Sequence, residues 1–248
     1  FLSHTHQLRY RLYVNGEPKG LGPGRGEYST NDETRATMYD VYDLSNHISS
    51  SLKIGIQSFH SDGKINARVI AEIRVIDSGS QFTIGTNTSW FAYSADYVFR
   101  PSTISQGNAY YSPLENIDGS EYAAIRSWPT RTDLNWSHAV AKSQFSALEP
   151  KRTLPITFEE GIQCTKLFRV EPNRYFFDFG EELMGGIRLE IFDASALENN
   201  FTLQVTLSEE LVNDTSVLYP MRTGNRYRSQ FISGYNNNTS HYYYEHHE

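Results

Sequence analysis

The stretch from residue 8 to residue 26, LRYRLYVNGEPKGLGPGRG, constrains the fold more than any other part of the sequence. Its first seven residues alternate, and this period of two predicts a β-strand whose buried face carries Leu8, Tyr10, Leu12 and Val14. Asn15-Gly16 follows, and the pair predicts a tight hairpin turn because both residues tolerate a positive φ. The glycines at 20, 22, 24 and 26, interrupted by Pro23, predict an ordered loop rather than a helix or a central strand.

The same pattern of short alternating strands and turn residues recurs along the chain. Such strands are predicted in the segments 38–44, 52–56, 67–76, 82–84, 89–94, 175–180, 187–191, 201–207, 231–232 and 242–244. The spacing predicts an all-β protein made of two consecutive antiparallel β-sandwich, jelly-roll-like domains. Prolines at 150 and 155 indicate an extended linker over Leu148–Pro155, so the predicted domains are 1–150 and 151–248.

Length and charge exclude some classes of partner. The 248 residues suffice for one large or two ordinary β domains. A formal net charge of -7 argues against nucleic acid, and no window approaches the roughly 18 apolar residues of a membrane span. The first residue is Phe1 and the last strand pattern stops without a turn. We therefore expect a processed or partial chain, with the second domain truncated at its C-terminal end.

Glycosylation sequons favour a secreted or extracellular glycoprotein. The acceptor asparagines are Asn87, Asn135, Asn200, Asn213, Asn237 and Asn238. The alternative is that a sequence rich in Asn, Ser and Thr contains some of these motifs by chance. The single cysteine, Cys164, allows no internal disulfide and is expected to be a small core residue.

Candidate chemistry is sparse in this sequence. The acidic doublets Glu159-Glu160, Glu181-Glu182 and Glu209-Glu210 are adjacent residues, which point to opposite faces of a strand. None of them is therefore the facing carboxylate pair that a glycoside hydrolase needs. Tryptophan is the best generic residue for stacking on sugars, although in a sandwich it more often fills the core.

The segment from Leu114 to Gly119 offers the most specific ligand hypothesis. Glu115, Asn116 and Asp118 place three oxygen-bearing side chains close together, a set that can hold a hard cation such as Ca²⁺. The alternative is an ordinary Asx turn. A cation held there would accept the hydroxyl pair of a sugar, with Asn116 among the sugar contacts and Trp128 stacking on the ring.

An ordered series of motifs resembles the bacterial-type α-L-rhamnosidases over nearly the whole chain. In the first part the motifs are YRLYVNG at 10–16, the glycine stretch 20–23, YDVYDL at 39–44, Ser89-Trp90, ENID at 115–118, Trp128 and Trp136. In the second part they are DFG at 178–180 with Gly185-Gly186, SEEL at 208–211 and NRY at 225–227.

This resemblance implies a galactose-binding-like sandwich followed by a concanavalin-like sandwich, both non-catalytic. In that family they precede an (α/α)₆ barrel that carries the catalytic acids and inverts at terminal α-L-rhamnosides, so no catalytic residue is expected here. The expected partners are a rhamnose-containing glycan or glycoside and the downstream catalytic domain of the same chain. The alternatives are a stand-alone carbohydrate-binding or adhesion module and a purely structural sandwich.

Overall fold

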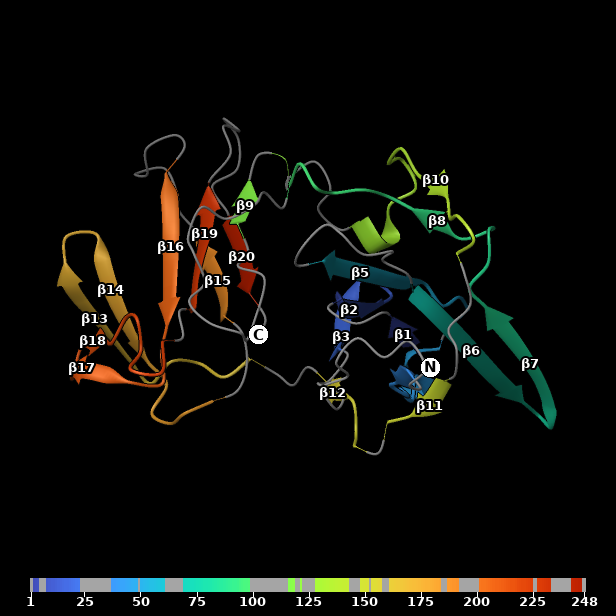
Figure 1. Cartoon of the computed structure of the whole chain (residues 1–248), viewed down its shortest axis with the longest axis horizontal. Coiled ribbons are helices and arrows are strands. Elements are labelled where there is room, and N and C mark those ends of the chain that lie inside the picture. Colours follow the sequence, from blue (N-terminus) through green and yellow to red (C-terminus); the bar gives the residue numbers. More distant parts are fainter. Residues whose placement is uncertain are drawn as a thin grey trace. The chain divides into compact units, whose positions relative to one another are not determined.

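The computed structural model confirms the predicted all-β fold (Figure 1). It describes residues 2–4, 8–22, 37–48, 50–60, 69–98, 116–118, 121, 128–142, 148–151, 153–157, 161–183, 187–191, 201–224, 227–232 and 242–246. The elements assigned in these ranges are β-strands and two short 3-10 helices. Most strand pairs are antiparallel, as predicted, and the pairs β4–β11 and β9–β19 are parallel.

The chain forms two compact units that are not continuous in sequence. The first unit comprises 1–94 and 127–159, and the second comprises 95–126 and 160–248. The sequence had suggested one change of domain within Leu148–Pro155. Packing instead places the last change between Glu159 and Glu160, and it assigns the internal segment 95–126 to the second unit.

The central sheet of the first unit has the strand order β12-β3-β2-β5. Its strands are β2 (Leu8–Val14), β3 (Glu17–Gly22), β5 (Ile54–His60) and β12 (Ile156–Thr157). The turn between β2 and β3 has φ values of 53° at Asn15 and 92° at Gly16, as the sequence predicts. Tyr10, Leu12 and Val14 are buried and form the core with Ala71 of β6, against which Ile54, Ile56 and Trp90 pack.

The prediction that the glycine stretch is a loop is wrong for Gly20 and Gly22. Both lie in β3, which pairs with β2 on one side and β12 on the other. A Cβ at Gly20 would lie 2.3 Å from the ring of Tyr42, and a Cβ at Gly22 would lie 2.5 Å from Tyr10. Glycine is therefore used here for close packing of two tyrosines against the strand, not for a turn.

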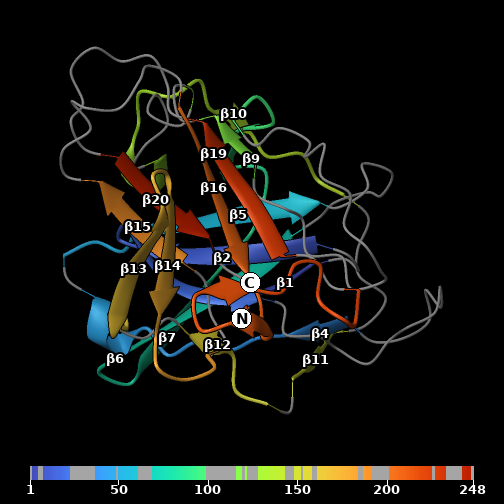
Figure 2. The same ribbon diagram turned by 90° about the vertical axis from the view of Figure 1, so that its left-hand side faces the viewer.

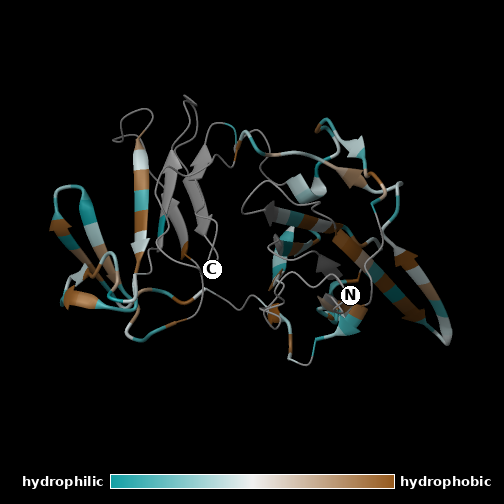
Figure 3. Cartoon of the chain, viewed as in Figure 1, coloured by the Kyte–Doolittle hydropathy of each residue, from teal (hydrophilic) through white to brown (hydrophobic). Residues whose placement is uncertain are grey.

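Three smaller sheets complete the first unit. They are β1-β6-β7, the ribbon β8–β10 and the parallel pair β4–β11. The strands are β1 (Leu2–His4), β4 (Thr37–Tyr39), β6 (Val69–Asp77), β7 (Ser80–Gly85), β8 (Phe91–Ala92), β10 (Ser137–His138) and β11 (Leu148–Pro150). The 3-10 helices are η1 (Ser45–His47) and η2 (Trp128–Thr130). Polar and apolar residues alternate along the β6–β7 hairpin, whose turn lies at Ser78-Gly79 (Figure 3).

The second unit is built from antiparallel pairs and one strand of the internal segment. Its strands are β9 (Asn116–Asp118), β13 (Lys166–Glu171), β14 (Arg174–Asp178), β15 (Ile187–Ile191), β16 (Thr202–Leu207), β17 (Leu211–Asn213), β18 (Ser216–Val217), β19 (Tyr227–Ile232) and β20 (Tyr242–His246). β19 lies between β16 and β9 in one sheet, and β16 and β19 lie side by side in both views (Figures 1 and 2). β9 therefore ties residues 116–118 to this unit.

Candidate carbohydrate-binding surface

Six aromatic side chains of the first unit, which we call the aromatic row, form one pair of ring contacts and one chain of four: Phe91 with His138, and Tyr93, Trp136, Trp128 and Tyr13. Phe91 of β8 pairs with His138 of β10, and their ring centroids are 5.1 Å apart. Tyr93, which follows β8, and Trp136, which precedes β10, meet edge to face at 5.7 Å.

Trp128 connects this ribbon to the central sheet. Its ring centroid lies 6.4 Å from that of Trp136 and 5.2 Å from that of Tyr13 on β2. Gly55 of β5 makes room for it, since a Cβ there would lie 3.0 Å from the Trp128 ring. Trp128 therefore packs partly against the sheet and remains half-buried. Stacking of a sugar on its ring stays a prediction.

Hydrogen bonds fix the rings of the aromatic row. The Trp136 indole Nε1–H donates to the carbonyl oxygen of Arg131 at 3.2 Å, and the Tyr13 hydroxyl donates to Gln57 Oε1 at 3.1 Å. His138 Nδ1 lies 3.1 Å from the carbonyl oxygen of Thr88. These contacts hold the ring planes before any ligand arrives, which reduces the entropy that binding would cost.

An exposed ion pair lies next to Trp136. The Arg131 guanidinium donates from Nε to Asp133 Oδ1 at 2.8 Å and also contacts Oδ2 through its terminal nitrogen. The hydrogen bond from Arg131 is the main reason that the pKa of Asp133 falls to about 2, and it raises the pKa of Arg131. Both groups therefore stay charged at neutral pH and can bind neighbouring hydroxyls of a polar ligand.

The residues of the predicted calcium and sugar site are placed in different units. Asn116 and Asp118 belong to β9 in the second unit, opposite Gln230 and Ile232 of β19. Trp128 belongs to the first unit, and Glu115 lies outside the described residues. Within the described ranges, no group of three or more His, Cys, Asp and Glu residues is arranged to hold a metal ion. Calcium binding at residues 115–118 stays a prediction.

Three of the six predicted glycosylation sites lie among the described residues. Asn87, Asn135 and Asn213 are all exposed. Asn87 Oδ1 accepts the backbone N–H of Ser89, and Asn213 Oδ1 accepts that of Thr215, so both asparagines start Asx turns. The other three asparagines, Asn200, Asn237 and Asn238, are outside the described residues.

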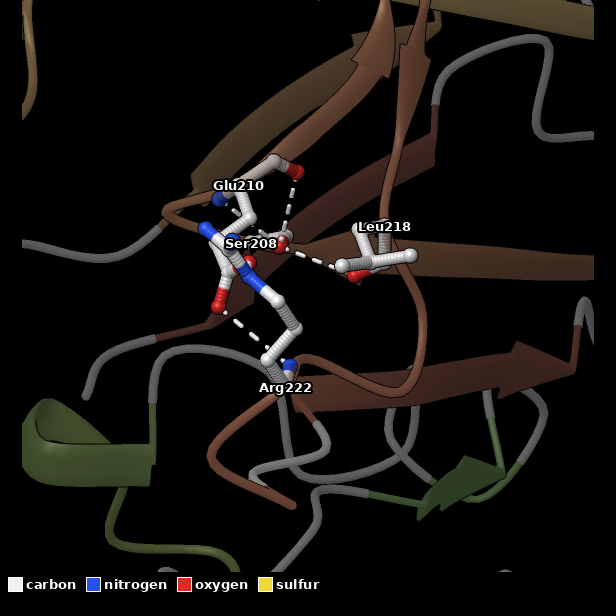
Figure 4. Close-up of polar contacts among 4 residues, drawn as sticks. All are labelled: Ser208, Glu210, Leu218 and Arg222. Carbon is white, nitrogen blue, oxygen red and sulfur yellow. Dashed lines mark hydrogen bonds and ion pairs between the residues drawn. The ribbon is translucent and has the colours of Figure 1, made fainter.

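A polar network in the second unit serves the backbone rather than a ligand (Figure 4). The Ser208 hydroxyl accepts the N–H of Glu210 at 3.1 Å and lies within hydrogen-bond distance of the carbonyl oxygens of Glu210 and Leu218. The Glu210 carboxylate accepts from Nε and from the backbone N–H of Arg222. Both oxygens of the Glu210 carboxylate therefore bind Arg222 and stabilise the loop after β18. The neighbouring Glu209 is exposed.

A second buried network joins the strands of the first unit. Tyr10 donates its hydroxyl proton to Asp40 Oδ2 at 2.6 Å, and the Tyr42 hydroxyl lies 3.0 Å from that of Tyr10. Asp40 is 1% exposed, and its Oδ1 lies 3.5 Å from the ammonium of Lys151 just after β11. This ion pair connects the residue that follows β4 with the residue that follows β11, so we assign it a structural role.

Sequence reasoning missed Phe91, Tyr93 and His138 as members of one surface. A signal was present, because Phe91 and Tyr93 alternate in one segment while Trp136 and His138 alternate in another. What the sequence could not provide was the pairing of β8 with β10, two segments more than forty residues apart, whose register is Ser137 opposite Ala92 and His138 opposite Phe91.

Comparisons with known proteins place the fold near one class of enzyme. No protein-family model and no curated protein matches the sequence. An α-L-rhamnosidase from Dictyoglumus thermophilum superposes with a TM-score of 0.63 and 21% identity over 99% of this chain and 27% of its own. For a Streptomyces avermitilis α-L-rhamnosidase complexed with L-rhamnose, the TM-score is 0.59 and the identity 16%, over 99% and 24%.

These comparisons establish a rhamnosidase-related fold. The chain spans about a quarter of the length of the two enzymes that it resembles. Among the described residues, no helix is both long and apolar enough to cross a membrane.

Proposed function

We propose that this chain is a non-catalytic accessory region of an α-L-rhamnosidase-like glycoside hydrolase that cleaves terminal α-L-rhamnosides. One observation carries the proposal: 99% of the chain superposes on only about a quarter of each of two α-L-rhamnosidases. The proposed catalytic site lies in a further domain of the same polypeptide, and these two units support that domain.

The acidic residues of the described chain support a non-catalytic role. A glycosidase needs one carboxyl group that can protonate the leaving oxygen and a second that faces it. Glu210 is instead paired with Arg222, and Glu181 and Glu182 are neighbours in an exposed stretch after β14. Asp133, with its pKa lowered to about 2 by Arg131, is too acidic to act as a general acid at neutral pH.

A second candidate function is a stand-alone carbohydrate-binding or adhesion module. The aromatic row favours this alternative, because fixed half-buried and exposed rings can stack on the C–H faces of sugars. The two candidates differ in what accompanies the chain: the first requires a catalytic domain in the same polypeptide, whereas the second requires only the binding surface.

Secretion, N-glycosylation and a calcium ion at residues 115–118 are parts of the proposal that need their own tests. Asn87, Asn135 and Asn213 are accessible to a glycosyltransferase. Mass spectrometry of protein secreted from the natural host would detect glycans at these asparagines. Calcium titration followed by calorimetry, with Asp118→Ala as the matched variant, would test the cation site.

The proposed function is tested by assaying the natural full-length protein that contains this chain against a panel of aryl glycosides. We expect hydrolysis of the α-L-rhamnoside at a kcat/KM at least a hundredfold above that for α-L-arabinoside, β-D-glucoside and β-D-galactoside. Absence of α-L-rhamnoside hydrolysis by the folded natural protein would refute the enzyme assignment.

A further inference from the structure

We propose that the exposed ring pair Phe91–His138 packs against the first sugar of an N-glycan carried by Asn87, so that the chain's own glycan covers this apolar pair. The identity of the covering group rests on the glycosylation of Asn87 that is proposed above, and the contact does not depend on the enzyme assignment. Such a contact makes the glycan a stabilising part of the β8–β10 ribbon.

The sequon at Asn87 forms a turn that leads directly into β8. Asn87 Oδ1 accepts the backbone N–H of Ser89 at 2.7 Å, and the carbonyl oxygen of Asn87 accepts the N–H of Trp90 at 3.2 Å. Phe91, the first residue of β8, follows this turn at once. Because the hydrogen bond at Oδ1 holds the side-chain amide of the exposed Asn87, it also fixes the direction of Nδ2, the atom to which a glycan is attached.

His138 brings the second ring to the same turn from β10. Its Nδ1 lies 3.1 Å from the carbonyl oxygen of Thr88, the middle residue of the sequon. The ring centroids of Phe91 and His138 are 5.1 Å apart, and their planes are inclined by 30°. One ring therefore contacts the sequon and the other directly follows the turn, so a sugar attached to Asn87 is within reach of both.

The exposure of the ring pair is the reason to expect a covering group. Phe91 is 61% exposed, and His138 is exposed as well. N-acetylglucosamine, the first sugar of an N-glycan, presents C–H groups and an acetamido methyl group that can pack on aromatic rings and remove their apolar surface from water. Because this sugar is tethered beside the rings, its effective concentration is high, and a contact too weak to hold a free sugar can still form.

The sequon at Asn213 provides a comparison in the second unit. Asn213 is exposed and starts the same kind of turn, because its Oδ1 accepts the N–H of Thr215 at 3.0 Å. The segment 208–218 around it contains no aromatic residue. A glycan at Asn213 therefore has no ring beside it on its own hairpin, and we expect it to stabilise the protein less.

The test is thermal unfolding of the 248-residue chain secreted from a eukaryotic host, with glycan occupancy measured by mass spectrometry. Ser89→Ala removes the hydroxyl that the sequon requires and keeps the backbone N–H that Asn87 binds. We expect it to lower the Tm by about 2–4 °C, the shift typical of one such contact in a chain of this size. Thr215→Ala, which removes the Asn213 sequon, should lower the Tm by less than about 1 °C. In protein made in bacteria, which carries no N-glycan, Ser89→Ala and wild type should have the same Tm.

The contribution of the rings is measured by combining Ser89→Ala with a ring variant. In a Phe91→Ala background, Ser89→Ala should no longer lower the Tm, because the glycan has lost its packing surface. Phe82→Ala is the control, because it removes a ring of β7 that is 53% exposed and precedes the sequon. In that background Ser89→Ala should retain its full effect.

An equal fall in Tm on Ser89→Ala in wild type and in Phe91→Ala would overturn the proposed contact, as would an unchanged Tm after loss of an occupied Asn87 glycan. A fall of the same size in the bacterial protein would also overturn it, because the effect would then belong to Ser89 itself. An unoccupied Asn87 would refute the glycosylation of this residue together with the contact. All of these outcomes are independent of rhamnosidase activity, so they are distinguishable from failure of the proposed enzyme.

Discussion

At the scale of single residues, Gly20 and Gly22 determine how closely the first unit can pack. Their missing side chains admit the Tyr42 ring at one position and the Tyr10 hydroxyl with Asp40 at the other. The sequence pattern indicated glycines for a loop, because it shows backbone freedom but not the neighbour that needs the space. The close packing of Tyr10 and Tyr42 against these glycines becomes visible only once β3 is paired with β2 and β12.

Gly22→Ala should destabilise the protein by about 1–3 kcal/mol, since overpacking of a well-packed core has that cost. The added Cβ would lie 2.5 Å from Tyr10 and 2.7 Å from Asp40 Oδ2. Gly85→Ala on β7 is the control, because its nearest neighbour would be 4.0 Å away. Urea unfolding measures both variants, and equal stability of Gly22→Ala and wild type would show that the two side chains can move aside.

The phenols of Tyr10, which is buried, and of Tyr42, which is half-buried, predict loss of stability at alkaline pH. Burial is the main cause that raises the pKa of Tyr10 and raises that of Tyr42 to about 12. In the unfolded chain a tyrosine pKa is about 10, so the unfolded state ionises first. The stabilisation is therefore complete below pH 10 and decreases as the pH rises toward 12.

This dependence is measurable by urea unfolding at pH 8 to 12. Tyr42→Phe should show a smaller decrease in the free energy of unfolding between pH 10 and 12 than wild type does. The exposed Tyr175 of β14 provides the control variant, Tyr175→Phe, which should retain the wild-type decrease. If the free energy of unfolding decreases equally between pH 10 and 12 in wild type and in Tyr42→Phe, ionisation of Tyr42 is not a cause of the alkaline destabilisation.

At the scale of elements, the network around Ser208 holds the segment that leads from β16 through β17 and β18 to residue 224. Ser208→Ala removes the acceptor of the Glu210 N–H and the single O–H donor that lies between two carbonyl oxygens. We therefore expect the free energy of unfolding to fall by about 1–2 kcal/mol. Arg222→Ala should have less effect, below about 1 kcal/mol, because the Arg222 side chain is 84% exposed and surface pairs contribute little.

Unfolding in guanidinium measures the free energy of unfolding of the Ser208→Ala and Arg222→Ala variants. Hydrogen exchange of the Leu218 N–H measures how far the segment around it is loosened. The Leu218 N–H donates to the carbonyl of Glu210 at 2.7 Å, so its exchange should accelerate in Ser208→Ala. If Arg222→Ala is less stable than Ser208→Ala, the Arg222–Glu210 ion pair, and not the Ser208 hydroxyl, is the main contact that stabilises this segment.

The pairing of β9 with β19 predicts how the chain responds to cleavage within the segment Leu148–Pro155. Trypsin cleavage at Lys151 or Arg152 should leave two pieces that co-elute in gel filtration, because β9 of the first piece pairs with β19 of the second. The two pieces should separate only in denaturant. Separation of two folded pieces in native buffer would instead favour independent domains divided within Leu148–Pro155.

Local patterns in the sequence predicted many of the strands and turns. The alternation in β2, the Asn15-Gly16 turn, the β6–β7 hairpin and the apolar strands β15 and β16 were all readable, since each depends on neighbouring residues. Non-local pairing was not readable: it decides that β9 belongs to the second unit and that Phe91 meets His138. Of the candidate surface, the sequence therefore predicted only Trp128 and Trp136, both as tryptophans that can stack on sugars.

At the scale of the whole molecule, the chain consists of two β units with a rhamnosidase-related fold, and the proposed function assigns them an accessory role beside a catalytic domain of the same polypeptide. The superposition covers 99% of this chain and about a quarter of each enzyme. This division of roles requires that activity and the 248 residues be separable.

The most direct measurement of this claim is the turnover of 4-nitrophenyl α-L-rhamnopyranoside by the purified 248-residue chain beside the natural full-length protein at equal molarity. We expect nitrophenol release by the full-length protein and none above the buffer rate by the chain. Turnover by the chain that persists through a second purification step and is lost in Glu182→Gln or Glu209→Gln would contradict the account, because it would place the catalytic site within these two units.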